Sequence, residues 1–156
     1  LGAQIFLPGG DWLQIAMLRR GLARAYFTPD EPDCADALYA AEQQARANRA
    51  GIWADPAYAV RTPETVKWRD TGTFQIVEGK VVSADVRGTR AYLDFGADWK
   101  TDFTATIPPD AMKLFSASNI DPRSYAGKII RVRGWIDEYD GPEIEIAAPQ
   151  DIELVK

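Results

Sequence analysis

The spacing of apolar residues changes once along this chain, at about Thr73, and the change predicts two halves that are built differently. Before that point apolar residues recur every three or four positions, as Leu38, Ala41 and Ala45 do, and this is the period of an amphipathic helix. After it, short runs alternate apolar and polar residues between turn residues, which is typical of half-buried strands. We therefore expect helices first and β-structure second.

The β-rich half contains five strand-like runs and one helical run, and their order indicates a fold. Five strands with a helix between the third and the fourth is the order of an OB-fold, a small closed Greek-key barrel. Asp140-Gly141 is a tight-hairpin signal between the last two strands. The expected strands are residues 74–83, 90–95, 102–107, 128–136 and 143–146, and the expected helix is residues 109–117.

The first half predicts short elements that are separated by glycine and proline. Residues 1–7 are typical of a strand that ends at a Pro-Gly-Gly turn, with Asp11 at the N-cap of a helix over residues 12–20. An extended run at residues 22–27 and a loop precede a long helix, which Gly51 ends. Prolines and polar residues then predict a linker. We expect domains at residues 1–57 and 73–156, joined by a linker at residues 58–72.

Composition excludes several kinds of chemistry. The 156 residues include no His and one cysteine, Cys34, so an internal disulfide, a zinc site and a Cys/His nucleophile pair all lack their residues. No run of apolar residues is long enough to span a bilayer. The net charge of −5 and the pI near 4.8 oppose non-specific attraction to nucleic acid. A nucleic-acid site therefore needs a local basic patch.

Several motifs of the first half resemble a known family. LRRGLARAYF at residues 18–27, Ala40-Ala41-Glu42 and Gly51-Ile52-Trp53 are similar to the C-terminal part of a staphylococcal-nuclease-like, or thermonuclease, domain, over residues 1–57. The resemblance implies a partial nuclease-type OB barrel with C-terminal helices, followed by a second five-stranded OB barrel, in the mainly β, α+β class. It also makes residues 1–7 the barrel strand that follows the second catalytic arginine.

The family's chemistry would lie upstream of the matched part. Such nucleases hydrolyse phosphodiesters with carboxylates that hold calcium, a glutamate that assists water and two arginines that stabilise the developing charge. None of these maps to this chain, so we assign no catalytic or metal residue. The resemblance implies the C-terminal region of a calcium-dependent endonuclease, inactive by itself. The compartment stays open, although a secreted or periplasmic parent fits the family.

Acidic residues of the first half are candidates for replacing that machinery. We expect Asp11 to serve in a turn or cap, and Glu42 to anchor its helix to a neighbouring loop. Four carboxylates stand close together before the long helix but lack the glycine and terminal glutamate of a calcium loop, so we expect a solvated acidic loop. These four are Asp30, Glu31, Asp33 and Asp36.

The OB-like half resembles nucleic-acid-binding OB modules, and one strand carries most of the candidate site. If Ile130 and its alternate neighbours point inward, the two-residue period of a strand sends Arg131, Arg133 and Trp135 outward together. Arginines with aromatic rings suit phosphates and stacked bases. The other candidate residues are Lys80, Arg87, Arg90, Tyr92, Trp99 and Lys100.

Alternatives to nucleic-acid contact remain open at this stage. Glu78, Asp94, Glu143 and Glu145 lie close enough in the expected sheet to neutralise the patch. The β5 residues would then pack against the linker or the nuclease-like half, or contact an unrelated protein partner. The acidic pI favours a second function, a non-catalytic protein-interaction scaffold of two OB-type barrels. An incomplete first barrel would also expose apolar side chains, so we expect a missing N-terminal segment or a second copy as a partner.

Overall fold

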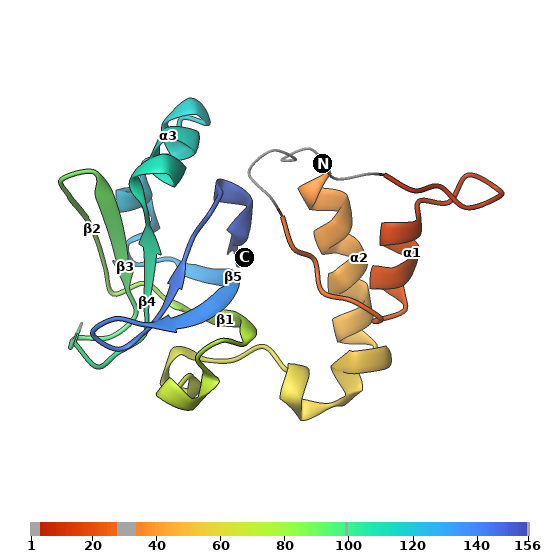
Figure 1. Ribbon diagram of the computed structural model, residues 1–156, viewed down its shortest axis with the longest axis horizontal. Coiled ribbons are helices and arrows are strands. Elements are labelled where there is room, and N and C mark those ends of the chain that lie inside the picture. The colour runs from red at the N-terminus through yellow and green to blue at the C-terminus, as the bar shows by residue number, and fades with distance from the viewer. Residues whose placement is uncertain (1–3, 28–33, 99, 156) are drawn as a thin grey trace. The chain divides into compact units, whose positions relative to one another are not determined.

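The computed structural model describes residues 4–27, 34–98 and 100–155 (Figure 1). Its residues form two compact units, Leu1–Ala59 and Val60–Lys156. Short three-ten turns punctuate both units. They lie at Gly51–Ala54, Pro56–Tyr58, Pro63–Thr65, Trp68–Asp70, Pro122–Tyr125 and Pro149–Asp151.

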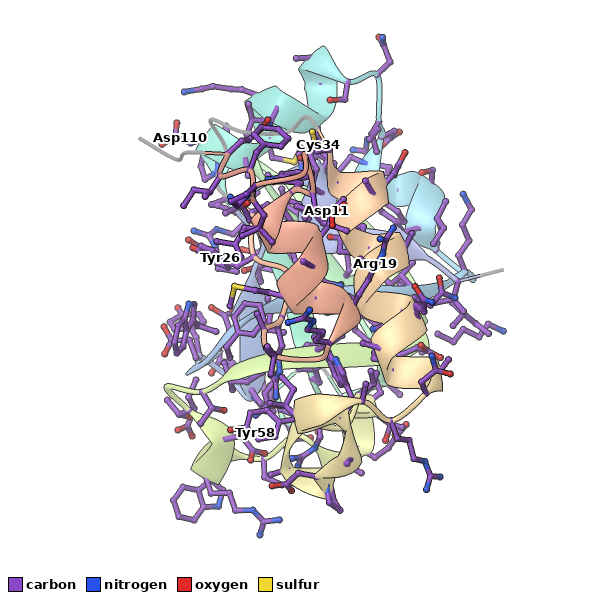
Figure 2. The ribbon with its side chains drawn as sticks, turned by 90° about the vertical axis from the view of Figure 1, so that its right-hand side faces the viewer. Asp11, Arg19, Tyr26, Cys34, Tyr58 and Asp110 are labelled. Atoms are coloured by element: carbon purple, nitrogen blue, oxygen red, sulfur yellow. The ribbon has the colours of Figure 1, made fainter. Side chains whose placement is uncertain are left out.

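The first unit contains two helices and an extended segment that packs on them. Helix α1 (Leu13–Arg19) contacts helix α2 (Ala35–Ala47). The extended segment, residues 22–27, supplies every second side chain to their small core. Its outward-facing side chains are exposed, among them Tyr26, labelled in Figure 2. The buried residues of this core are Leu18, Ala25, Phe27 and Ala41.

The predicted strand at residues 1–7 is largely absent from the part that the structure describes. From Gln4 onward, only Phe6 pairs, through a single antiparallel bridge to Trp12. The turn after Leu7 reverses the chain, and the Leu7 N–H donates to the Asp11 carbonyl oxygen at 2.8 Å. Helix α1 begins directly afterwards with Trp12, not Asp11, as its N-cap. The chain therefore has no room for a longer ladder, and Asp11 is a turn residue.

Two glycines join the ends of the two helices of the first unit. The Ile52 N–H donates to the carbonyl oxygen of Gly21 at 2.9 Å, and both Gly21 and Gly51 have positive φ. A Cβ at Gly21 would lie 2.0 Å from the Ala50 carbonyl oxygen, and one at Gly51 would lie 2.2 Å from the Gly21 oxygen. Because such contacts are far below van der Waals distance, only glycine fits at either position.

The second unit is an OB-type barrel, as the sequence predicts. Its sheet order is β1-β5-β6-β4-β3-β2, with β7 paired to β5, and parallel pairing of β4 with β6 joins the two halves of the sheet. Helix α3 (Pro109–Ala117) lies between β4 and β5, and its Phe115 is fully buried in the barrel core. The strands are β1 (Phe74–Lys80), β2 (Ser83–Arg87), β3 (Arg90–Asp94), β4 (Thr104–Ile107), β5 (Ile129–Glu138), β6 (Pro142–Glu145) and β7 (Ile152–Leu154).

The first expected strand, residues 74–83, is two strands in the structure. At the break the Val81 N–H donates to the Lys128 carbonyl oxygen, whereas the Val82 N–H donates to that of Asp94. The chain therefore leaves β5 and joins β3 here, because a small barrel must turn a corner. The Asp140-Gly141 hairpin is confirmed, with positive φ at both residues, and it joins β5 to β6. Strand β7 was not predicted.

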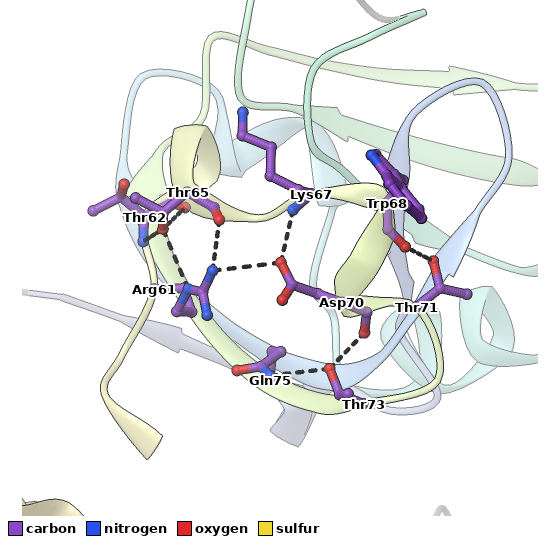
Figure 3. A network of polar contacts seen from close by, with 9 residues as sticks. All are labelled: Arg61, Thr62, Thr65, Lys67, Trp68, Asp70, Thr71, Thr73 and Gln75. Atoms are coloured by element: carbon purple, nitrogen blue, oxygen red, sulfur yellow. Dashed lines mark hydrogen bonds and ion pairs between the residues drawn. The ribbon is translucent and has the colours of Figure 1, made fainter. Parts of the chain in front are cut away.

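Residues 60–72, most of the expected linker, form part of the second unit (Figure 3). Arg61 pairs with β1 through a parallel bridge to Val77. The Arg61 guanidinium donates to the Thr65 carbonyl oxygen at 2.6 Å and lies 3.4 Å from a carboxylate oxygen of Asp70. That carboxylate also accepts from the Lys67 N–H at 2.8 Å. The segment is therefore folded onto the barrel.

Close packing between strands also depends on one glycine of the barrel. A Cβ at Gly134 would lie 2.5 Å from the Ile144 methyl group of β6, so the glycine lets β6 cross β5 closely.

In the described ranges, no helix is long and apolar enough to cross a membrane.

Candidate nucleic-acid interface

The candidate residues lie on two outer surfaces of the barrel and in one loop. Strand pairing places the first set together across β1, β5 and β7, and the second set across β2, β3, β4 and β6. We call the first set the β5 face: Phe74, Glu78, Lys80, Arg131, Arg133, Trp135 and Glu153. We call the second the β3 face: Asp85, Arg87, Arg90, Tyr92, Asp94, Thr104, Thr106, Glu143 and Glu145.

The alternation expected along β5 is confirmed. Ile130, Val132 and Ile136 are buried in the barrel core, and Gly134 faces Ile144. The side chains between them are therefore turned to the outer side of the sheet. Their burial nevertheless differs greatly from one to the next.

Arg131 is held between two carboxylates. Its guanidinium lies 2.6 Å from a carboxylate oxygen of Glu78 on β1 and 3.3 Å from one of Glu153 on β7. A second nitrogen, Nε, donates to the same Glu78 oxygen at 3.1 Å. The side chain is 16% exposed. Because both neighbours accept charge-assisted hydrogen bonds, the positive charge of Arg131 is locally balanced.

Arg133 lies on the expected side of β5 but is buried. Only 1% of its surface is exposed, which fits the alternative that it packs against protein. Its Nη2 donates to the other carboxylate oxygen of Glu153 at 2.7 Å. The physical reason lies partly in β7, which adds to β5 beside Arg131 and places Glu153 against both arginines. Burying a guanidinium is costly unless a partner compensates the charge, and Glu153 is such a partner.

Trp135 is the most exposed ring on the β5 face. Its side chain is 57% exposed, and its ring stands edge-on to Phe74, with centroids 5.8 Å apart. Lys80, at the far end of β1, is exposed as well. Trp135 therefore offers an indole surface to solvent beside the paired arginines.

On the β3 face each basic residue has an acidic or aromatic neighbour. The Arg87 guanidinium lies 5.5 Å from the ring centre of Tyr92 and 4.0 Å from an Asp85 carboxylate oxygen. Arg90 lies 2.9 Å from a carboxylate oxygen of Glu145. The cation–π and ion-pair contacts hold both guanidinium groups close to the sheet.

Carboxylates outnumber basic groups on the β3 face. Asp94 accepts hydrogen bonds from the hydroxyls of Ser83 at 2.8 Å and Thr104 at 3.3 Å. Burial raises the pKa of the Glu143 carboxyl, Arg90 lowers it, and the nearby carboxylates of Glu145 and Asp137 raise it further. The expectation that acidic residues neutralise this patch therefore fits the geometry, and the face carries a net negative charge.

The loop after β3 carries the last two candidates. Lys100 is exposed, and its backbone N–H donates to an Asp98 carboxylate oxygen at 3.1 Å. Asp102 accepts from the Asp98 N–H at 2.9 Å and stabilises the same loop. Trp99 lies outside the described residues.

The carboxylates of the first unit show no metal-binding arrangement where they are described. Glu42 is fully buried and accepts from the Ala25 N–H at 2.8 Å, with Arg46 at 3.7 Å. Its predicted anchoring role is thereby confirmed. Three of the four clustered acidic residues, Asp30, Glu31 and Asp33, lie outside the described ranges. Within those ranges, no group of three or more His, Cys, Asp or Glu side chains could hold a metal ion.

Sequence reasoning missed two residues of the β5 face, Phe74 and Glu153. The alternation of Ile152, Glu153 and Leu154 carries a weak strand signal, but three residues are too few to separate a strand from a tail. Phe74 was assigned to a strand, and only its cross-strand register opposite Trp135 reveals the contact.

Comparisons with known proteins found similar solved structures and one sequence family. No curated protein matches the chain. Among solved structures, asparaginyl-tRNA synthetase from Pyrococcus horikoshii is 14% identical, covering 64% of this chain and 23% of its own, with a TM-score of 0.45. The OBody AM1L10 bound to hen egg-white lysozyme is 16% identical, covering 59% and 88%, with a TM-score of 0.43. The S. pombe Stn1–Ten1 complex is 15% identical, covering 53% and 58%, with a TM-score of 0.38.

The chain thus spans less than a quarter of the length of the synthetase. The first unit matches a sequence family. Residues 2–55 match the family described as staphylococcal nuclease homologue, in the region where the helix and Gly51-Ile52-Trp53 motifs carry the resemblance.

Proposed function

We propose that the second unit is a nucleic-acid-binding module that takes single-stranded DNA or RNA on its β5 face. The observation that carries the proposal is the exposed indole of Trp135, braced by Phe74 and set on the same strand side as Arg131 and Arg133. Stacked bases and backbone phosphates are bound by this combination of ring and guanidinium groups in single-strand-binding proteins. Lys80 extends the face at its other end.

Charge sets the expected strength of this binding. The chain has a net charge of −5, and Glu78 and Glu153 already neutralise the two arginines. Phosphate attraction supplies most of the affinity of such proteins and depends on unpaired cations. Binding should therefore be weak at physiological salt and should depend more on stacking than on charge.

Removing the indole tests the proposal. Trp135→Ala should weaken binding of a fluorescent oligo(dT) strand about 5- to 100-fold, the value of one stacked base. Trp68→Ala is the matched control, because Trp68 is also an exposed tryptophan but lies in a three-ten turn outside the β5 face. Equal affinities of Trp135→Ala and the wild-type chain, measured by anisotropy, would contradict the assignment of this face.

We further infer that the chain is the C-terminal region of a nuclease-family protein, whose intact form would use calcium. The match over residues 2–55 supports this. If the family's carboxylates and arginines lie outside this chain, as the resemblance implies, this chain with calcium should leave single-stranded DNA uncut on a denaturing gel. A version extended toward its N-terminus should cut it. An inactive extended protein would contradict the inference.

A second candidate function is a protein-interaction scaffold. The observation that favours it is the excess of carboxylates on the β3 face, which would repel phosphates and attract a basic protein surface. Exposed Ile5, Phe6 and Leu22 of the first unit also fit a second copy of the chain that would cover them. Sedimentation equilibrium would reveal a second copy as a concentration-dependent mass. Leu22→Ser should then lower that mass.

A further inference from the structure

Strand β7 is the shortest barrel strand in the described ranges, although its Ile152 packs in the barrel core. It has three residues, pairs only with β5, and lies off the main strand order. One more backbone bond follows it, from the Val155 N–H to the Ile129 carbonyl oxygen at 3.1 Å. By contrast, β1 pairs with β5 over seven residues on the other edge. Short edge elements with few backbone bonds open most easily.

The side chain that β7 contributes to the β5 face is Glu153. One of its carboxylate oxygens lies 3.3 Å from Arg131, and the other lies 2.7 Å from Arg133. A single carboxylate thus bridges two guanidinium groups on one strand. A phosphate would be held in the same way, because two of its oxygens would accept hydrogen bonds from the two guanidinium groups.

Both arginines are largely covered, and Glu153 is one of the groups that contact them. Their side chains are 16% and 1% exposed, whereas a phosphate must approach a guanidinium nitrogen to within about 3 Å. The neighbouring Trp135 remains accessible. The β5 face therefore presents its stacking ring while its cations are covered, so some element must move before a phosphate reaches them.

We propose that residues 152–155 are an autoinhibitory strap, in which Glu153 occupies the phosphate position of the β5 face and leaves when single-stranded nucleic acid binds. The proposal rests on the proposed function of that face. Glu78 is a poorer candidate for release, because the seven-residue β1–β5 ladder holds it in place. Displacing β7 removes the carboxylate shared by both arginines and leaves that ladder intact.

The test is Glu153→Gln in the full chain, with binding of oligo(dT) measured by anisotropy over a range of salt concentrations. The amide keeps the shape but loses the charge, so the affinity should rise about fivefold and the salt slope should steepen by about 0.7 for each phosphate gained. Glu138→Gln is the control, because it removes the same charge from an exposed position of β5. It should change both values much less.

A double variant, Arg131→Met with Arg133→Met, tests whether the effect of Glu153→Gln acts through the two arginines. In that background Glu153→Gln should give no gain, since the cations that it uncovers are gone. Should the double variant fail to fold, as judged by circular dichroism, hydrogen exchange in the wild-type chain replaces it. Oligo(dT) should then speed exchange of the Ile152–Val155 amides and spare those of β1.

The outcomes separate the strap from the function itself. If the wild-type chain and both glutamine variants bind with equal affinity and salt slope, the strap is wrong and the β5 face still binds. If β7 stays fully protected during binding, the strap is also wrong. If no variant binds oligo(dT), and Trp135→Ala has nothing to weaken, the proposed function and the strap both fail.

Discussion

The two units stabilise themselves in different ways, and the difference indicates which part can be disturbed without loss of the other. In the described ranges, the first unit has a small core around Leu18, Ala25 and Phe27, and its helix ends touch backbone to backbone at Gly21 and Gly51. The second unit has a large continuous core inside a barrel, plugged by Phe115 of α3. The first unit therefore combines a small core with one very close backbone contact, whereas the second relies on a large core.

The largest expected effect tests that close contact. Gly51→Ala places a methyl group 2.2 Å from the Gly21 carbonyl oxygen and requires a left-handed backbone at alanine, so the first unit should lose its fold. Urea unfolding followed by circular dichroism should then show only the transition of the barrel.

Gly9→Ala is the control for this substitution. Gly9 also has positive φ, but a Cβ there would meet nothing within 4 Å. It should cost only backbone strain, about 1 to 3 kcal/mol. A Gly51→Ala chain that unfolds like the Gly9→Ala chain would show that the helix ends can separate harmlessly.

The next effect tests the distributed core. Phe115→Ala removes a fully buried ring and should lower the free energy of unfolding of the barrel by about 3 to 5 kcal/mol. The first unit should be unaffected if the two units unfold independently. A matched shift of both transitions would mean that they unfold as one. Met112→Ala, at a partly buried position of the same helix, should have a smaller effect.

The smallest effect concerns the pH dependence of the barrel. Burial raises the pKa of the Asp151 carboxyl from 3.8 to about 6, although the N–H groups of Ala148 and Ala147 and the charge of Arg133 lower it. Since the folded pKa is the higher one, this group's contribution to stability is fully present below about pH 4 and is lost as the pH rises through 6. The loss amounts to about 3 kcal/mol. Glu143 acts in the same direction.

Asp151→Asn isolates this contribution from the other carboxylates. The amide stays neutral, so the variant should gain stability relative to the wild-type chain as the pH rises from 4 to 7. Urea midpoints of the barrel transition at these two pH values measure the gap. If the difference in urea midpoint between the variant and the wild-type chain stays constant or narrows, the raised pKa of Asp151 is contradicted.

Local signals predicted the barrel well, and contacts between distant segments explain what they missed. Helix α3 begins and ends at the predicted residues, since Pro109 starts it and Asn119 follows it with positive φ. The Asp140-Gly141 hairpin was equally visible. The burial of Arg133 was not, because the alternation along a strand gives the side of the sheet but not the partners found there. One such partner, Glu153, lies on β7, twenty residues further along the chain.

The sequence predicted which residues share the candidate site better than it predicted which of them are exposed. The alternation along β5 placed Arg131, Arg133 and Trp135 on one side of the sheet, as found. Whether a side chain on that side is exposed or covered depends on its partners on neighbouring strands. Glu153 is too far along the chain for a local sequence pattern to pair it with these arginines. The break at Val81 and Val82 was missed for the same reason, since both flanking runs look continuous in sequence.

The Gly21–Gly51 contact also supplies a reporter for the first unit. The Ile52 amide proton is the one that reaches across to Gly21, so in a ¹⁵N-labelled sample a single cross-peak follows whether the two helix ends remain joined. Its chemical shift should vary little with temperature while the contact lasts. A partner that covers exposed Leu22, which directly follows Gly21, could thus be detected at this single backbone proton.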